Sequence, residues 1–234
     1  MSAPVAASSP RHGSPPLWLL ATLYTVLFNI GLAPVTMLGG LPYWPGPWAP
    51  VSDIVSYFPT HVSRVLFCVF FQTGANICFG LFAAVVVSRL HFLGVRAAGA
   101  YIALFGGFMV AFDSIAAALT TWTMLRPAVS SSAPVLLGLY YLSYAFGGPG
   151  FSIPMGLLMA GVSISGGLAH LLPKWIVVLG LVLAAAGELS TLHLIFPQLL
   201  FLIPLTRFPG FVWIIAVGIK LPRSRSSRLQ MQAA

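Results

Sequence analysis

Two acidic residues lie inside long apolar runs, where their residue type could support chemistry. Asp113 and Glu188 each fall within a stretch long enough to cross a bilayer as a helix. A charge at mid-membrane costs on the order of 3 kcal/mol, so an ionisable residue there indicates a functional role by default. A carboxyl group in such surroundings suits a general acid or a proton carrier.

Polar side chains at helical spacing supply the neighbours of these acids. Residues three, four or seven positions apart share one face of a helix. Gln72 and Asn76 are four positions apart, and Asn29 lies on a stripe that also contains threonines. The sequence therefore predicts a polar pocket in the outer half of a helix bundle. Its predicted lining is Asp113, Glu188, Gln72, Asn76 and Asn29, with Arg64 and Arg207 near the mouth as counter-charges.

A purely structural role for the same residues stays open. Small residues flank both acids, and such residues let membrane helices approach closely while amides and hydroxyls bond across the gap. Asp113 and Glu188 would then be protonated or paired with an arginine, and no ligand would be involved.

Motifs for metal or cofactor chemistry are missing from the sequence. It has no His-Glu-x-x-His, no Gly-x-Ser-x-Gly and no glycine loop that ends in lysine. Cys68 and Cys78 fall in one predicted helix, about 15 Å apart along its axis, which is too far for a disulfide. We therefore expect no metal site and no cofactor.

Composition defines the elements that must position these residues. Of 234 residues, 59% are hydrophobic and 6% charged, against roughly 25% charged in a soluble domain. One helical crossing needs about 20 apolar residues, and the apolar runs supply about six crossings. We predict an all-α polytopic membrane bundle whose fourth and sixth crossings are broken. The predicted crossings are residues 17–38, 64–87, 98–125, 151–168, 174–196 and 207–221.

The segments between the crossings have their own signatures. Residues 39–63 combine prolines with aromatic residues, which predicts a loop on the membrane surface. Residues 135–146, before a run of glycine and proline, are predicted as a short interfacial or half-inserted helix, and 198–206 as an approach to the sixth crossing.

Three parts make up the predicted domain organisation. Residues 1–16, rich in alanine, serine and proline, are expected to be disordered. Residues 17–221 form the transmembrane domain, and residues 222–234 form a basic tail.

The distribution of positive charge predicts the orientation. With six crossings and a cytoplasmic start, eight of the eleven Lys and Arg residues fall on the cytoplasmic side and three outside. An excess of Lys and Arg marks cytoplasmic loops, so both termini are expected in the cytoplasm. The charges form no basic face of the kind that a duplex requires, so we expect no nucleic-acid partner.

Two short stretches near the end of the chain carry a family resemblance. Leu172-Pro173-Lys174-Trp175 opens the predicted fifth crossing, and Pro209-Gly210-Phe211-Val212-Trp213 lies in the sixth. With the overall length and the six crossings, this order resembles a family of uncharacterised bacterial multi-pass membrane proteins. The resemblance implies a bacterial inner membrane location and supplies no catalytic residue.

Three classes of function fit the sequence. The favoured class binds a small apolar or weakly cationic molecule, or a partner subunit, through the polar pocket; the chain could also form a homo-oligomer. The second is a proton-coupled secondary transporter that uses Asp113 or Glu188. The third is a membrane-embedded isomerase or cyclase of a lipid-like substrate, with these two residues as acid and base.

Overall fold

The computed structural model describes residues 11–224, and the regular elements in that range are helical. Within this range, six segments are long and apolar enough to cross a membrane. The predicted all-α bundle with six crossings is therefore confirmed, and the chain is a membrane protein. The segments are Leu17–Val35, Val62–Phe92, Ala98–Met124, Ala133–Leu168, Lys174–Leu194 and Pro197–Lys220.

Each crossing is built around one or two α-helices. These are α1 (Leu17–Leu32), α3 (Val62–Phe92), α4 (Ala98–Met124), α6 (Ala133–Gly147) with α7 (Pro149–Leu168), α8 (Lys174–Leu189) and α9 (Leu202–Lys220). Short elements connect or extend them: η1 (Ala33–Val35), η2 (Met37–Gly39), α2 (Val51–Thr60), α5 (Pro127–Ser130), η3 (Ser190–Leu194) and η4 (Pro197–Phe201).

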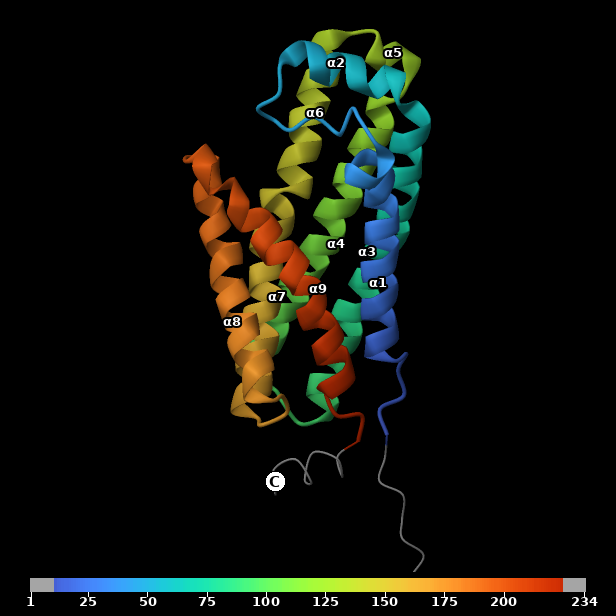
Figure 1. Cartoon of the computed structure of the whole chain (residues 1–234). Coiled ribbons are helices and arrows are strands. Elements are labelled where there is room, and N and C mark those ends of the chain that lie inside the picture. The colour runs from blue at the N-terminus through green and yellow to red at the C-terminus, as the bar shows by residue number, and fades with distance from the viewer. Residues whose placement is uncertain (1–10, 225–234) are drawn as a thin grey trace, which may run out of the picture.

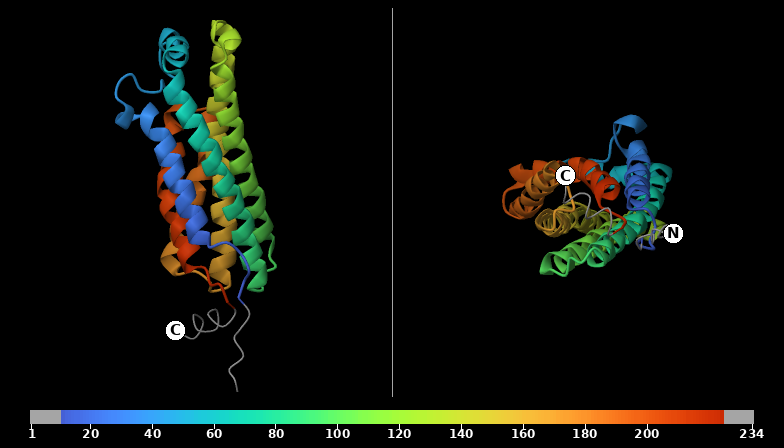
Figure 2. Two further views of the ribbon diagram at one scale, coloured as in Figure 1. Left: turned by 90° about the vertical axis from the view of Figure 1, so that its right-hand side faces the viewer. Right: turned by 90° about the horizontal axis from the view of Figure 1, so that it is seen from below.

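The bundle has two distinct ends (Figure 1). Residues 11–16 and 221–224 lie together at one end, which we call the terminus end. The other end carries α2 and α5, and we call it the far end. Figure 2 shows the helices running side by side between these two ends.

Helix α7 is the centre of the bundle. It packs against α4, α6, α8 and α9. In the most apolar stretch of its crossing 67% of residues are buried, against 33–44% in the other five. Glycine permits the close approach of α4: a Cβ on Gly106 would lie 2.5 Å from the carbonyl oxygen of Pro154 and 2.7 Å from the amide nitrogen of Leu158.

The fourth crossing is broken as predicted. Of the two alternatives for its first half, the interfacial helix is wrong, because α6 is inserted as part of the crossing. Helix α6 packs along α4 and continues in the direction of α7, and the break lies at Gly148 (φ −95°, ψ −100°). The crossing Ala133–Leu168 has 36 residues, about 54 Å of helix, which exceeds the roughly 30 Å of a hydrocarbon core. Part of α6 therefore extends past the apolar layer.

The sixth crossing also has two parts, with an earlier junction than predicted. The 3-10 helix η4 passes directly into α9 at Leu202, whereas we expected the crossing proper to begin at Arg207. Helix α9 contains Pro209, which lacks a backbone N–H and so removes one helical hydrogen bond without ending the helix.

One connecting loop and the segment before α1 are more ordered than their composition suggests. The loop 39–63 contains α2, which starts after Pro50 and has Pro59 in its last turn, where the missing N–H removes one helical hydrogen bond just before the helix ends. Residues 11–16, expected to be disordered, pair with the other terminus: the amide of His12 donates to the carbonyl of Arg223 at 2.9 Å. The rest of the predicted disordered segment and most of the basic tail lie outside the described residues.

Candidate ligand pocket

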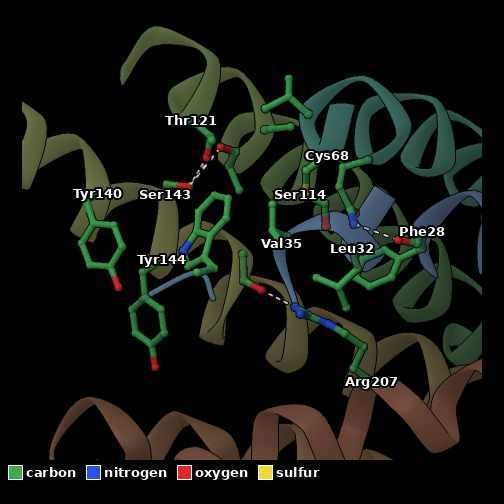
Figure 3. A pocket seen from close by; sticks show the side chains of 16 residues that line it. Phe28, Leu32, Val35, Cys68, Ser114, Thr121, Tyr140, Ser143, Tyr144 and Arg207 are labelled. Carbon is green, nitrogen blue, oxygen red and sulfur yellow. Dashed lines mark hydrogen bonds between the residues drawn. The ribbon is translucent and has the colours of Figure 1, made fainter. Parts of the chain in front are cut away.

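A partly open pocket of about 250 Å³ lies between five helices in the far half of the bundle (Figure 3). Helices α1, α3, α4, α6 and α9 contribute to it, and Trp44 closes it from the loop before α2. Its lining comprises Phe28, Leu32, Val35, Trp44, Cys68, Val69, Gln72, Ser114, Ala117, Ala118, Thr121, Tyr140, Ser143, Tyr144, Gly147 and Arg207.

Arg207 is the charged group of this lining. It lies in the second turn of α9, and its guanidinium donates to the carbonyl of Gly147, the last residue of α6. Its guanidinium carbon lies 4.2 Å from the ring centre of Phe151 and 5.4 Å from that of Phe28. The Nε atom is buried without a hydrogen-bond partner.

Hydroxyl groups form the polar wall opposite Arg207. Thr121 and Ser143 share a hydrogen bond of 2.7 Å, and Ser143 also donates to the carbonyl of Ala117 at 3.1 Å. The hydroxyl of Tyr144 lies 2.7 Å from Nε2 of His193, which ties α6 to η3. These hydroxyls were not predicted from the sequence, although residues 140, 143, 144 and 147 have the spacing of one helix face.

The predicted polar residues are distributed differently from the expectation. Gln72 and Arg207 line the pocket, and Gln72 donates to the carbonyl of Phe28 at 3.1 Å. Asn76 is fully buried one turn further along α3 and bonds the carbonyl of Gln72. Asn29 is exposed and bonds within α1. Arg64 lies at the start of α3 and does not line the pocket.

Asp113 lies beside the break in the fourth crossing. It is 6% exposed, and a Cβ on Gly150, in the first turn of α7, would lie 3.4 Å from its Oδ2. A helix N-terminus carries partial positive charge and a C-terminus partial negative charge. The break therefore has a carboxyl group beside the start of α7 and a guanidinium on the end of α6. Among the described residues, neither Asp113 nor Arg207 has an ion-pair partner.

Glu188 does not share a site with Asp113. It is exposed on α8, and its Oε1 would lie 2.9 Å from a Cβ on Gly156 of α7. Gly150 and Gly156 are about 9 Å apart along α7 and roughly 120° apart around it, because six residues turn the helix by about 600°. The two acids thus face different sides of α7, so the geometry does not support an acid and base acting on one substrate.

Comparisons with protein-family models, with characterised protein sequences and with solved structures give no match.

Proposed function

We propose that this membrane protein binds a small amphipathic anion in the pocket between α1, α3, α4, α6 and α9. The observation that carries the proposal is that Arg207 is the charged residue of the lining, with no carboxylate paired to it. A carboxylate or phosphate group would satisfy the guanidinium, and the aromatic and aliphatic walls would cover an apolar body. The proposed anion differs from the apolar or weakly cationic ligand expected from the sequence. That expectation depended on Asp113 and Glu188, which do not line the pocket.

Arg207 also has a structural role as the partner of the α6 carboxyl end, so the test must separate the two roles. We expect Arg207→Gln to lose an acidic small molecule that co-purifies with the wild type, as measured by mass spectrometry of the detergent-solubilised protein. Arg207→Lys should retain part of it, because lysine keeps the charge but not the bidentate geometry.

Arg126→Gln is the matched control, because Arg126 lies at the same end of the bundle outside the pocket and over the ring of Trp122. It should keep the full ligand content. Equal content of acidic molecules in all the variants, or none in the wild type, would contradict the proposal.

A proton-coupled transporter is the second candidate, and the position of Asp113 favours it. Broken helices near an ionisable residue form the substrate and ion sites of many transporters. Asp113→Asn should then abolish solute movement driven by a pH gradient in liposomes, and Asp113→Glu should retain it. If Asp113→Asn lowers only the melting temperature, the carboxyl group acts as structural support for α7.

The positive charges support an orientation with the terminus end in the cytoplasm, and the resemblance of residues 172–175 and 209–213 to a bacterial family supports an inner membrane location. Residues Arg11, Arg89, Arg96, Lys174, Lys220 and Arg223 lie toward the terminus end, and Arg64, Arg126 and Arg207 toward the far end. A fluorescent protein fused after residue 234 should fluoresce; loss of fluorescence together with activity of an exported phosphatase fusion would reverse the orientation.

A further inference from the structure

A second buried cation lies at the terminus end of α3. Arg89 is 1% exposed, yet only one of its nitrogen atoms is bonded: Nη1 donates to the carbonyl of Leu221 at 3.3 Å. Its Nε and Nη2 atoms are buried without a hydrogen-bond partner. Burying an unpaired charge costs free energy, and a bound anion would offset that cost for the Arg89 guanidinium.

No acidic side chain of this chain is placed to supply that anion. The sequence contains three acidic residues. Asp53 is on α2 at the far end, Asp113 lies beside the α6–α7 break, and Glu188 is at the last turn of α8 toward the far end. None of these three carboxyl groups can therefore serve as the anion for Arg89.

The groups around Arg89 add positive charge instead. The positive charges of Arg89 and Arg223, after the larger effect of burial, lower the pKa of His12. His12 lies on the last turn of α3, where its Nε2 is 3.1 Å from the hydroxyl of Ser88 and its ring is 5.2 Å from that of Phe92. The basic groups of His12, Arg89 and Arg223 therefore form one cluster.

The depth of this cluster indicates the class of anion. Helix α3 has 31 residues, about 46 Å, which exceeds a hydrocarbon core of roughly 30 Å. Its last turn carries Arg89 and His91 and lies at the end of the bundle where Lys174 begins α8 and Lys220 ends α9, so these charges mark the level of the lipid headgroups. We propose that Arg89, with Arg223 and His12, binds a phosphate group, either of a phospholipid headgroup or of a soluble phosphate. Arginine favours phosphate because its planar fork donates two parallel hydrogen bonds.

The two chain segments beside Arg89, residues 11–14 and 223–224, can move apart to admit a phosphate group. Residues 11–14 and 223–224 are not helical, and Arg11 and Ser224 form an antiparallel bridge. The bonds between these segments include those from the amide of His12 to the carbonyl of Arg223 and from Nη2 of Arg223 to the carbonyl of Ser14 at 3.3 Å. Separating these two short segments would expose the cluster without breaking a hydrogen bond inside a helix.

The test measures melting temperature with defined probes in a phosphate-free buffer. Wild type in phosphatidylcholine nanodiscs should melt at a higher temperature when phosphatidylglycerol is included, because that lipid offers a phosphate without the choline cation. This increase in melting temperature should be less than half as large in Arg223→Gln and absent in Arg89→Gln. A rise with inorganic phosphate alone, lost in the same variants, assigns the site to a soluble phosphate.

Two further variants keep the test decisive. Arg96 is exposed at the same end but outside the cluster, so Arg96→Gln should respond like the wild type. Arg223→Glu places a carboxylate beside Arg89 at an exposed position, so it should raise the basal melting temperature and remove the response to lipid even if Arg89→Gln fails to fold. The proposal is overturned if neither probe stabilises the wild type, or if Arg223→Glu and Arg223→Gln respond as strongly as Arg96→Gln.

Discussion

The polar wall of the pocket depends on a single buried hydroxyl pair. Thr121 on α4 and Ser143 on α6 are 4% and 7% exposed, and their hydrogen bond is one of two polar links that Ser143 makes to α4. Ser143 has a second partner in the carbonyl of Ala117, whereas Thr121 depends on Ser143 for its side-chain bond. The orientation of α6 toward the pocket is therefore sensitive to Thr121.

We expect Thr121→Val to cost about 1 kcal/mol of stability, because it removes this bond while keeping the side-chain volume. Melting temperature in detergent measures the effect, and a double-mutant cycle with Ser143→Ala isolates the pair. Thr123→Val is the control, because the Thr123 hydroxyl bonds only the carbonyl of Leu119 in its own helix. A coupling energy near zero would show that the hydroxyls do not hold α6.

The sequence identified some site residues and not others for a physical reason. Gln72 and Arg207 were predicted because a polar residue in an apolar run needs a partner. Ser114, Thr121 and Ser143 were missed, because hydroxyls can bond their own helix and give no clear signal in sequence. Glu188 was expected to face the bundle interior with its small neighbours, but only those neighbours are buried against α7, and Glu188 is exposed with one carboxyl oxygen beside Gly156.

At the scale of the helices, the contact between α4 and α7 depends on small residues. Gly106 faces the backbone of Pro154 and Leu158, and Gly99 and Gly161 oppose each other nearer the terminus end. Backbone atoms cannot move aside as a flexible side chain can. Close packing of this kind replaces the hydrophobic driving force that is absent between helices in lipid.

Gly106→Ala should therefore destabilise the bundle by about 1–3 kcal/mol, because the added Cβ overpacks a rigid contact. Gly74→Ala on α3 offers a matched control, because no heavy atom lies within 4 Å of its added Cβ. The melting temperature should fall for Gly106→Ala and stay unchanged or rise for Gly74→Ala. Equal melting temperatures would show that α4 can move away from α7 without cost.

Crossing number and most helix boundaries were predictable because hydropathy and length decide them. Helix α4 begins and ends within one residue of the prediction. The path of α6 was not predictable in the same way, since an apolar stretch of 15 residues suits an interfacial helix as well as half of a long crossing. Its packing on α4 decides between them, and that contact is not visible in the order of residues.

At the scale of the whole molecule, the first and last described segments of the chain meet at one end. Residues 11–14 lie against 223–224 and the last turn of α3, so the first, second and last crossings are joined there. His12 is the titratable group at this junction, with Arg89 and Arg223 as its charged neighbours. The junction is therefore sensitive to pH.

Burial and the two arginines hold the pKa of His12 below its ordinary value of about 6.5. The folded form thus takes up a proton less readily than the unfolded form, and stability falls as the pH drops below about 6.5 toward the lower folded pKa. We expect the melting temperature of the wild type to fall over that range relative to His12→Ala. Parallel pH profiles for the two proteins would contradict this.

If the pocket binds the anion that we propose, the bond between Arg207 and the carbonyl of Gly147 couples the bend of the fourth crossing to occupancy of the pocket. An anion that draws the guanidinium away weakens its hold on the end of α6. The angle between α6 and α7 then changes with occupancy. Because such coupling is reciprocal, a force that straightens or bends α6 at Gly148 in turn changes the affinity of the pocket for the anion. Lateral tension in the bilayer, acting on the longest crossing of the bundle, is such a force.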